Sequence, residues 1–157
     1  MFEIILDCEA SGLSDESYPI EIGWVNKDLI YLEEDSFLIR PHETWTYWDE
    51  YAEKQIHHIS REQLFDEGIS VKEACERLIS KIGTKEYVYS DAPPYERMWL
   101  NKLFRVVGKE RPFGIKNVIN LISPKDDSYF YTNVKPVKHR ALDDARQIAE
   151  RINRLQL

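Results

Sequence analysis

The sequence has few cysteines and no long apolar segment, and each shortage excludes a class of protein. Its two cysteines form neither a disulfide framework nor a zinc-binding pattern, so we expect Cys8 and Cys75 to be buried free thiols. No apolar run approaches the roughly 18 residues needed to span a bilayer, and the N-terminus is acidic where a secretory signal is basic. We therefore expect a cytoplasmic protein without a membrane segment.

Several catalytic and architectural patterns are also missing. The chain has no nucleophile elbow and no glycine-rich oxyanion turn, which argues against a serine or cysteine hydrolase. It has no repeat, low-complexity tract or linker, and 43% of its residues are hydrophobic, which is enough for one core. We expect residues 1–157 to form a single domain.

Charge is divided unevenly along the chain. Residues 1–96 hold 8 Lys and Arg against 22 Asp and Glu, a net charge of −14, whereas residues 97–157 hold 13 against 6, a net charge of +7. Basic residues are concentrated over 97–116, and further ones lie over 135–154. These stretches are either solvated helix faces or contacts for the phosphates of a polyanion.

The order of the expected strands and helices indicates an α/β domain. Residues 2–7, 20–25 and 29–39 have the patterns of strands and predict an antiparallel start to a sheet. Capping boxes at Ser60 and Ser70 predict two helices. Later segments predict a strand over 86–90, a helix over 95–107, a strand over 118–121 and a last helix from Ala141. This order favours a mixed sheet flanked by helices.

Asp7 and Glu9 lie one residue apart in the first strand, so their side chains share one face. At about 4 Å and an effective dielectric near 20, two such charges repel by on the order of 4 kcal/mol. A divalent cation removes this cost, and carboxylate oxygens suit Mg²⁺ or Mn²⁺. Gly12 would let the backbone approach a ligand closely. The alternative is an exposed acidic strand end.

The segment "HRALDDA", residues 139–145, provides a second acidic element. Asp144 lies at the border of the apolar stripe of the last helix and is expected to face the sheet, whereas Asp143 is expected to face water. His139 precedes this helix, and the usual pKa of imidazole suits a general base near neutral pH. Taken alone, His139 would more often be an ordinary surface residue.

Together these segments resemble the DEDD superfamily of 3′-to-5′ exonucleases, in its histidine-containing branch (DEDDh). "DCEASGL", residues 7–13, is similar to the first motif, and "HRALDDA" is similar to the third. "QIHHIS", residues 55–60, resembles an intervening Ile/Val-His-Gly-Ile-Ser/Thr element, with His58 replacing the glycine. The resemblance implies a ribonuclease H-like fold, with a mixed sheet whose first three strands are antiparallel and whose later strands are parallel.

The resemblance also implies an activity and a ligand set. Members hydrolyse the terminal phosphodiester bond of single-stranded RNA or DNA with two Mg²⁺ or Mn²⁺ ions and release nucleoside 5′-monophosphates. By resemblance, His139 would activate the attacking water, and a short single-stranded oligonucleotide would be the substrate. The implied metal ligands are Asp7, Glu9, Asp144 and a fourth carboxylate from the second motif.

The second motif departs from the family pattern. In "YSDAPPYERMWL", residues 89–100, alignment to the family puts Asp91 where an Asn-like residue is expected and Glu96 where the catalytic Asp is expected. Either carboxylate is a candidate ligand, with Glu96 favoured. The alternatives are a turn residue for Asp91 and a first-turn acid that stabilises the helix for Glu96.

Residues near the first motif are candidates for binding the terminal nucleotide. By resemblance, Ser11, Gly12 and Leu13 would meet its 3′ end, and His57 would line the same pocket unless it is an exposed residue flanking a helix. A rival hypothesis, motivated by Glu96 and His58, is an inactive or weakened nucleic-acid-binding module with this fold. A phosphohydrolase with Asp7 as nucleophile lacks its Lys-containing partner motif. RNA or DNA as substrate, and monomer or homodimer as assembly, are left open.

Overall fold

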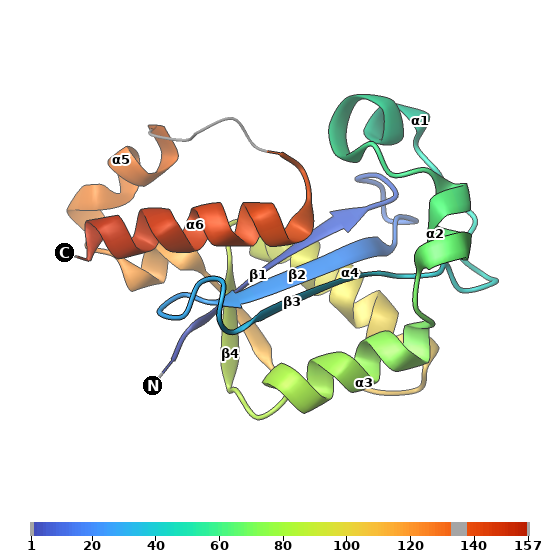
Figure 1. Cartoon of the computed structure of the whole chain (residues 1–157), viewed down its shortest axis with the longest axis horizontal. Helices are drawn as coiled ribbons and strands as arrows, with labels where there is room; N and C mark the ends of the chain where they lie inside the picture. The colour runs from blue at the N-terminus through green and yellow to red at the C-terminus, as the bar shows by residue number, and fades with distance from the viewer. Residues whose placement is uncertain (1, 133–137, 157) are drawn as a thin grey trace.

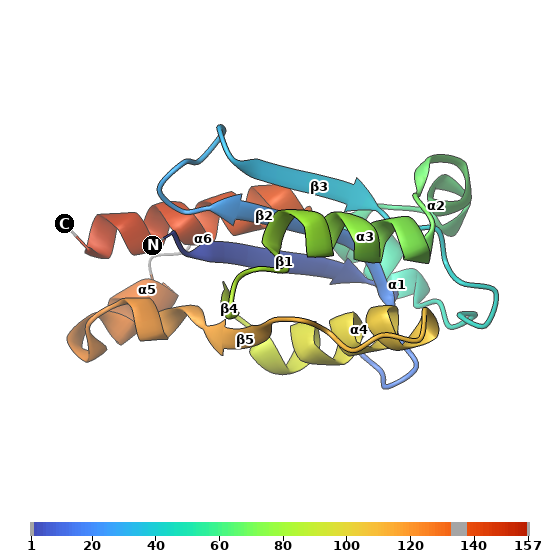
Figure 2. The same cartoon turned by 90° about the horizontal axis from the view of Figure 1, so that it is seen from below.

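A computed structural model describes residues 2–132 and 138–156 and within them contains a mixed five-stranded sheet (Figure 1). The strands are β1 Ile4–Ala10, β2 Pro19–Asn26, β3 Glu34–Leu38, β4 Tyr87–Ser90 and β5 Gly114–Asn117. Their order is β3-β2-β1-β4-β5, as Figure 2 shows. β1, β2 and β3 pair antiparallel, whereas β4 pairs parallel with both β1 and β5. This confirms the expected ribonuclease H-like arrangement.

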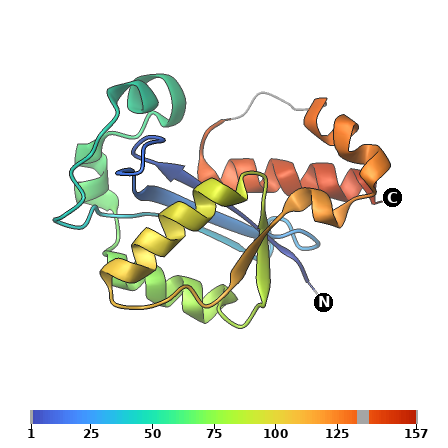
Figure 3. The same ribbon diagram turned by 180° about the vertical axis from the view of Figure 1, so that it is seen from behind.

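Helices cover both faces of the sheet. They are α1 Glu50–Ala52, α2 Arg61–Glu67, α3 Val71–Ile82, α4 Pro93–Val106, α5 Asp127–Thr132 and α6 Ala141–Leu155, with a π-helical segment at Glu53–His57 and 3₁₀ segments at Val118–Leu121 and Pro124–Asp126. α6 lies in front of the sheet in Figure 1, and α3 and α4 lie on the opposite face, which Figure 3 presents. No helix among the described residues is long and apolar enough to cross a membrane.

The alternation of β1 divides the core into two clusters. Leu6 and Cys8 pack in the cluster that α3 and α4 cover, whereas Ile5 packs with the apolar stripe of α6. Successive side chains of a strand point to opposite faces, so Asp7 and Glu9 share the face of Ile5. The two carboxylates are thereby directed to the side of the sheet on which α6 lies.

Local sequence signals account for several boundaries. Ser60 Oγ accepts a hydrogen bond from the backbone N–H of Gln63 at 3.0 Å, and Ser70 Oγ accepts one from that of Glu73 at 3.1 Å. Both side chains satisfy N–H groups that lack a partner at the start of a helix, so the two predicted helix starts are confirmed. Cys8 and Cys75 are buried free thiols, also as predicted.

Two predicted strands have clearly different limits in the structure. β1 continues through Ala10, beyond residue 7, because Glu9 pairs with Glu21 of β2. The third strand covers only Glu34–Leu38, since the chain turns after Asn26 with Leu29 N–H donating to Asn26 O at 3.0 Å.

The strand predicted over 118–121 is wrong. The strand there is β5, Gly114–Asn117, and residues 118–121 form a 3₁₀ turn. Asn117 causes the change, because its side chain accepts a hydrogen bond from the backbone N–H of Ile119 at 3.0 Å and so ends the strand.

α6 approaches the sheet closely at Gly23 of β2. A Cβ atom at this position would lie 2.3 Å from the backbone nitrogen of Leu142 and 2.5 Å from the carbonyl carbon of Ala141. Only a residue without a side chain permits this contact between backbones. Gly23 therefore sets the depth at which the first turn of α6 lies on β2.

Candidate active site

One cleft brings together acidic residues from three parts of the chain. It has a volume of about 450 Å³. Its acidic residues and one histidine come from β1, from the segment after β4 with the first turn of α4, and from the approach to α6 and its first turn: Asp7, Glu9, Asp91, Glu96, His139 and Asp144. The predicted metal ligands, both candidates for the second motif and the predicted base thus share one cleft.

Glu9, His139 and Asp144 form the tightest cluster in the cleft. Each offers a ligand atom, and these atoms lie within 4.8 Å of one another. Glu9 and Asp144 are only 8% and 6% exposed. Oδ1 of Asp144 is buried and has no hydrogen-bond partner among the described residues. A buried, unpartnered carboxylate oxygen is costly, and a cation would satisfy it.

The crowded carboxyl groups favour protonation when no cation is near. Burial, with the charge of Asp144 next, raises the pKa of Glu9 to about 9. Burial also raises the pKa of Asp144 to about 6, which nearby His139 opposes. The pKa of Asp7 is raised well above its usual value by burial and then by Glu96. Metal ions displace protons from such ligands, so this electrostatic arrangement fits a divalent cation.

Glu96 is held firmly inside the cleft, whereas Asp91 lies at its rim. Glu96 is 2% exposed and accepts a hydrogen bond from Ser90 Oγ at 2.6 Å. The same hydroxyl accepts a hydrogen bond from Ala92 N–H at 3.0 Å, which ties the end of β4 to the start of α4. Burial raises the pKa of Glu96 to about 8 although Ser90 opposes the shift. Asp91 has the larger exposed surface, although burial raises the pKa of its carboxyl group as well.

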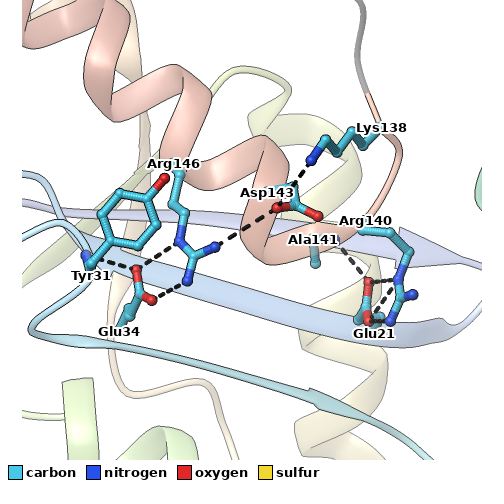
Figure 4. Close-up of polar contacts among 8 residues, drawn as sticks. All are labelled: Glu21, Tyr31, Glu34, Lys138, Arg140, Ala141, Asp143 and Arg146. Carbon is cyan, nitrogen blue, oxygen red and sulfur yellow. Dashed lines mark hydrogen bonds and ion pairs between the residues drawn. The ribbon is translucent and has the colours of Figure 1, made fainter.

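An ion pair between Glu21 and Arg140 anchors the start of α6 (Figure 4). The carboxylate of Glu21 accepts hydrogen bonds from Arg140 Nε at 3.0 and 3.1 Å and from Nη2 at 2.6 Å. It also accepts one from the backbone N–H of Ala141 at 2.8 Å. Glu21 stands opposite Glu9 in the sheet, so this contact sets the position of His139 and Asp144 relative to β1.

A second ion pair holds α6 six residues further along the chain. Arg146 bonds the carboxylate of Glu34, whose other contact is the backbone N–H of Tyr31 (Figure 4). Asp143 lies outside the cleft, with Lys138 at 4.0 Å and Arg146 at 3.8 Å. Asp143 and Asp144 therefore face different surroundings, in the manner that the helical stripe predicted.

Two parts of the predicted nucleotide pocket lie elsewhere. Ser11 is fully buried, and its Oγ accepts a hydrogen bond from Tyr18 N–H at 3.1 Å. Gly12 lies against Tyr47, since a Cβ atom there would be 2.7 Å from the ring. These groups close the loop between β1 and β2 and do not line the cleft. Leu13 does line it and is 63% exposed.

His57 also departs from the prediction. It is 3% exposed, where a pocket-lining or exposed histidine was expected, and it does not line the cleft. Its Nδ1 accepts a hydrogen bond from Ile59 N–H at 3.0 Å, and its ring packs against the edge of Trp48. Burial lowers the pKa of His57 to about 4, so it is a neutral core residue.

Sequence reasoning missed several residues at the site. Gln147, Ile148 and Arg151 line the cleft from α6, and the guanidinium of Arg151 lies 4.0 Å from the ring centroid of Phe130. Their spacing of three, four and seven residues from Asp144 places them on one helix face. The sequence therefore contained a signal that could have predicted them as neighbours of Asp144. Glu21 had no such signal, because its partner is distant in the sequence.

Comparisons with known proteins identify the fold. No family model and no curated protein matches the chain. Exonuclease I of E. coli, in a zinc-bound complex with single-stranded DNA, superposes with a TM-score of 0.74 at 10% identity, over 98% of this chain and 40% of that one. The nuclease domain of 3′hExo, a DEDDh family member bound to rAMP, gives 0.69 at 18% identity, over 99% and 92%. A full-length 3′-exonuclease gives 0.66 at 17%, over 99% and 81%.

These likenesses define a class of structure. The chain has the ribonuclease H-like fold of the DEDDh exonucleases, and it spans about two fifths of exonuclease I but nearly all of the 3′hExo nuclease domain. At identities of 10 to 18% the agreement concerns the fold. What this chain does must be argued from its own cleft.

Proposed function

We propose that this protein is a metal-dependent 3′-to-5′ exonuclease of the DEDDh type. It hydrolyses the terminal phosphodiester bond of single-stranded nucleic acid and releases nucleoside 5′-monophosphates. The observation that carries the proposal is the cleft, in which four carboxyl groups converge beside a histidine on a fold shared with such enzymes: Asp7, Glu9, Glu96 and Asp144, with His139.

The four carboxylates are proposed to hold two Mg²⁺ or Mn²⁺ ions. The donor set consists of hard oxygens, which these ions prefer, and the unpartnered Oδ1 of Asp144 fits a ligand role. When bound, the ions would supply an activated water and stabilise the negative charge of the leaving oxygen. Glu96 is preferred to Asp91 because its carboxylate is buried and held by Ser90.

His139 is proposed as the group that accepts the proton of the attacking water. Its ring lies beside Glu9 and Asp144, yet it remains partly exposed, so it can pass the proton to solvent. The ion pair between Glu21 and Arg140, the residue after His139, would hold this geometry. Leu13, Tyr95 and Trp99 give the cleft apolar walls, which suit the base and sugar of a terminal nucleotide.

The proposed setting is the cytoplasm. Cys8 and Cys75 are unpaired, and free thiols are typical of proteins in a reducing compartment.

A nuclease assay with matched variants tests the proposal. Single-stranded RNA and DNA 12-mers with a 5′ label are incubated with the protein and Mn²⁺ or Mg²⁺. The expected products are a ladder shortened from the 3′ end and free 5′-mononucleotides, and the better polymer identifies the substrate. Asp144→Asn is expected to lower kcat by more than about 100-fold, since loss of supporting residues alone costs a metal site 10- to 100-fold.

Asp143→Asn is the matched control, because Asp143 neighbours Asp144 but lies outside the cleft. It is expected to retain activity. Binding of the 12-mer without cleavage would favour the inactive binding module instead. Glu96→Gln and Asp91→Asn compare the two candidates for the second motif, and a larger loss in Asp91→Asn would reverse the assignment.

A further inference from the structure

α4 connects the cleft to a basic recess at its other end. Tyr95 and Glu96 in its first turn line the cleft, and Arg105 near its last residue lines the recess. In Figure 3, α4 is the yellow helix. The basic recess has a volume of about 460 Å³ and is lined by Asn101, Arg105, Lys109, Glu110, Arg111, Pro112, Phe113 and Gly114.

The three cations of the basic recess outnumber its one acidic residue, Glu110. In the part of the chain that the structure describes, Arg105, Lys109 and Arg111 form no ion pair, whereas Arg77 and Arg146 each bond a carboxylate. Burial and the positive charge of nearby Arg97 both lower the pKa of Arg111. In a chain with a net charge of −7, such a local excess of positive charge favours an anionic ligand.

Neutral acceptors fix the orientation of Arg111 in the recess and of nearby Arg97 without removing their charge. Arg111 Nε donates to Asn101 Oδ1 at 3.0 Å, and its guanidinium also bonds the carbonyl of Phe113. Arg97 Nη1 donates to the carbonyl of Ile115 at 2.9 Å. Arg105 and Lys109 are exposed beside them. The recess therefore combines one preorganised cation with two exposed ones, which suits phosphate groups.

The other cations of residues 97–116 have different contacts. Lys102 Nζ donates to the carbonyls of Asp15 and Ser17 at 2.9 and 2.8 Å, and Lys116 Nζ lies 3.7 Å from the ring centroid of Tyr87. Of the second basic stretch that the sequence indicated, Lys135 lies outside the described residues. Of the basic residues over 97–116, only Arg105, Lys109 and Arg111 therefore line the basic recess.

A further hollow of about 530 Å³ lies along α4, next to the basic recess. It shares Asn101 and Arg105 with the recess and also includes Met98, one turn from Tyr95 of the cleft. Nine residues separate Glu96 from Arg105, which at about 1.5 Å per residue is roughly 14 Å. At about 3.4 Å per stacked nucleotide, this distance corresponds to roughly four nucleotides.

We propose that the basic recess binds the phosphodiester backbone of the substrate about four nucleotides from its 3′ end. The inference rests on the proposed exonuclease function and extends it: the preferred substrate is a strand longer than about four nucleotides, which contacts both ends of α4. Shorter oligonucleotides occupy only the cleft.

The test is the double variant Arg105→Gln/Lys109→Gln, assayed on a single-stranded 12-mer and a trinucleotide. Both residues are exposed, so the fold is expected to persist. KM for the 12-mer should rise about fivefold, since an exposed charge pair contributes a small free energy, with kcat unchanged. The slope of log(1/KM) against log salt should become shallower by about 1 to 1.5. KM for the trinucleotide should not change.

Lys72→Gln/Lys81→Gln removes the same charge from α3 and is the matched control. A 12-mer KM and salt slope equal to those of the wild type, or equal effects in the two double variants, would refute the inference. If the wild type cleaves neither substrate, the exonuclease function fails instead. Fluorescence anisotropy of a labelled 12-mer then tests the recess alone, and Arg105→Gln/Lys109→Gln must weaken binding more than the control does.

Discussion

The metal-free protein is expected to lose stability as the pH rises from 6.5 to 8.5. Glu9 and Glu96 have ordinary pKa values of 4.5, raised to about 9 and about 8 in the folded protein. In this range the unfolded chain has released these protons while the folded protein keeps them. Because the folded state binds more protons, the free energy of unfolding falls with increasing pH.

The expected loss of stability follows from the number of protons that the folded protein retains and the unfolded chain has released. Each excess proton lowers the free energy of unfolding by about 1.4 kcal/mol per pH unit. The carboxyl groups interact, so the protons belong to the cluster, and one or two retained protons give a loss of about 3 to 5 kcal/mol across the two units. For a chain of this length that corresponds to a decrease in Tm of roughly 6–20 °C.

The pH window avoids an opposing contribution from His57. Its pKa is lowered to about 4 from an ordinary 6.5. Between these values the unfolded chain binds the extra proton, so this residue makes stability rise with pH, and the effect ends above pH 6.5. Above pH 6.5 the carboxyl groups of the cleft therefore control how stability changes with pH.

Thermal unfolding in EDTA, and again with 1 mM Mn²⁺, measures the effect. Mn²⁺ should raise Tm at every pH, and most at pH 8.5, because bound metal competes with protons for the same oxygens. Glu9→Gln should raise the Tm of the metal-free protein at pH 8.5 and make its pH dependence shallower. A metal-free Tm that is constant or increases from pH 6.5 to 8.5 would refute the reasoning about the buried carboxylates.

Three substitutions probe the frame around the cleft. Gly23→Ala should destabilise the protein by about 3 kcal/mol or more and lower kcat, because the new methyl group would meet the backbone of α6. Urea denaturation measures the stability and a nuclease assay measures kcat. An unchanged urea midpoint would contradict the close approach of α6 to β2. Glu21→Gln should lower the free energy of unfolding by about 2–3 kcal/mol and reduce kcat, since it weakens the contacts to Arg140 and Ala141. Full activity would show that the contact between Glu21 and α6 does not position the site. His58→Gly should stabilise the protein by about 0.5–1 kcal/mol with activity unchanged. His58 has a φ of 57°, a backbone conformation that costs energy for every residue except glycine. A lower Tm for the variant would count against strain at this position.

Much of the fold was predictable because its signals are local. The caps at Ser60 and Ser70 act on N–H groups three residues away, and the apolar stripe of α6 is a property of one helix. Boundaries set by pairing between strands were predicted less well. β1 extends through Glu9 because β2 offers it a partner, and no pattern within residues 2–7 contains that information.

The residues of the candidate site also divide into those that local patterns predicted and those that depend on tertiary contacts. The motifs placed Asp7, Glu9, His139 and Asp144 correctly in one cleft, since each occurs in a recognisable local pattern. The sequence favoured Glu96 over Asp91 but left both as candidates, because both are acidic and both follow the same strand. The distinction depends on how the first turn of α4 directs Glu96 toward Ser90.

The sequence by itself determined the order of strands and helices, the two acidic motifs and the uneven distribution of charge. The tertiary structure alone decided that Glu96 is buried, that Ser11 and His57 lie outside the cleft, and that Glu21 anchors α6. The physical reason is distance along the chain: these outcomes depend on contacts between segments up to 120 residues apart. Local periodicity and capping patterns describe only neighbours, whereas burial and pairing of charges depend on which segments fold against each other.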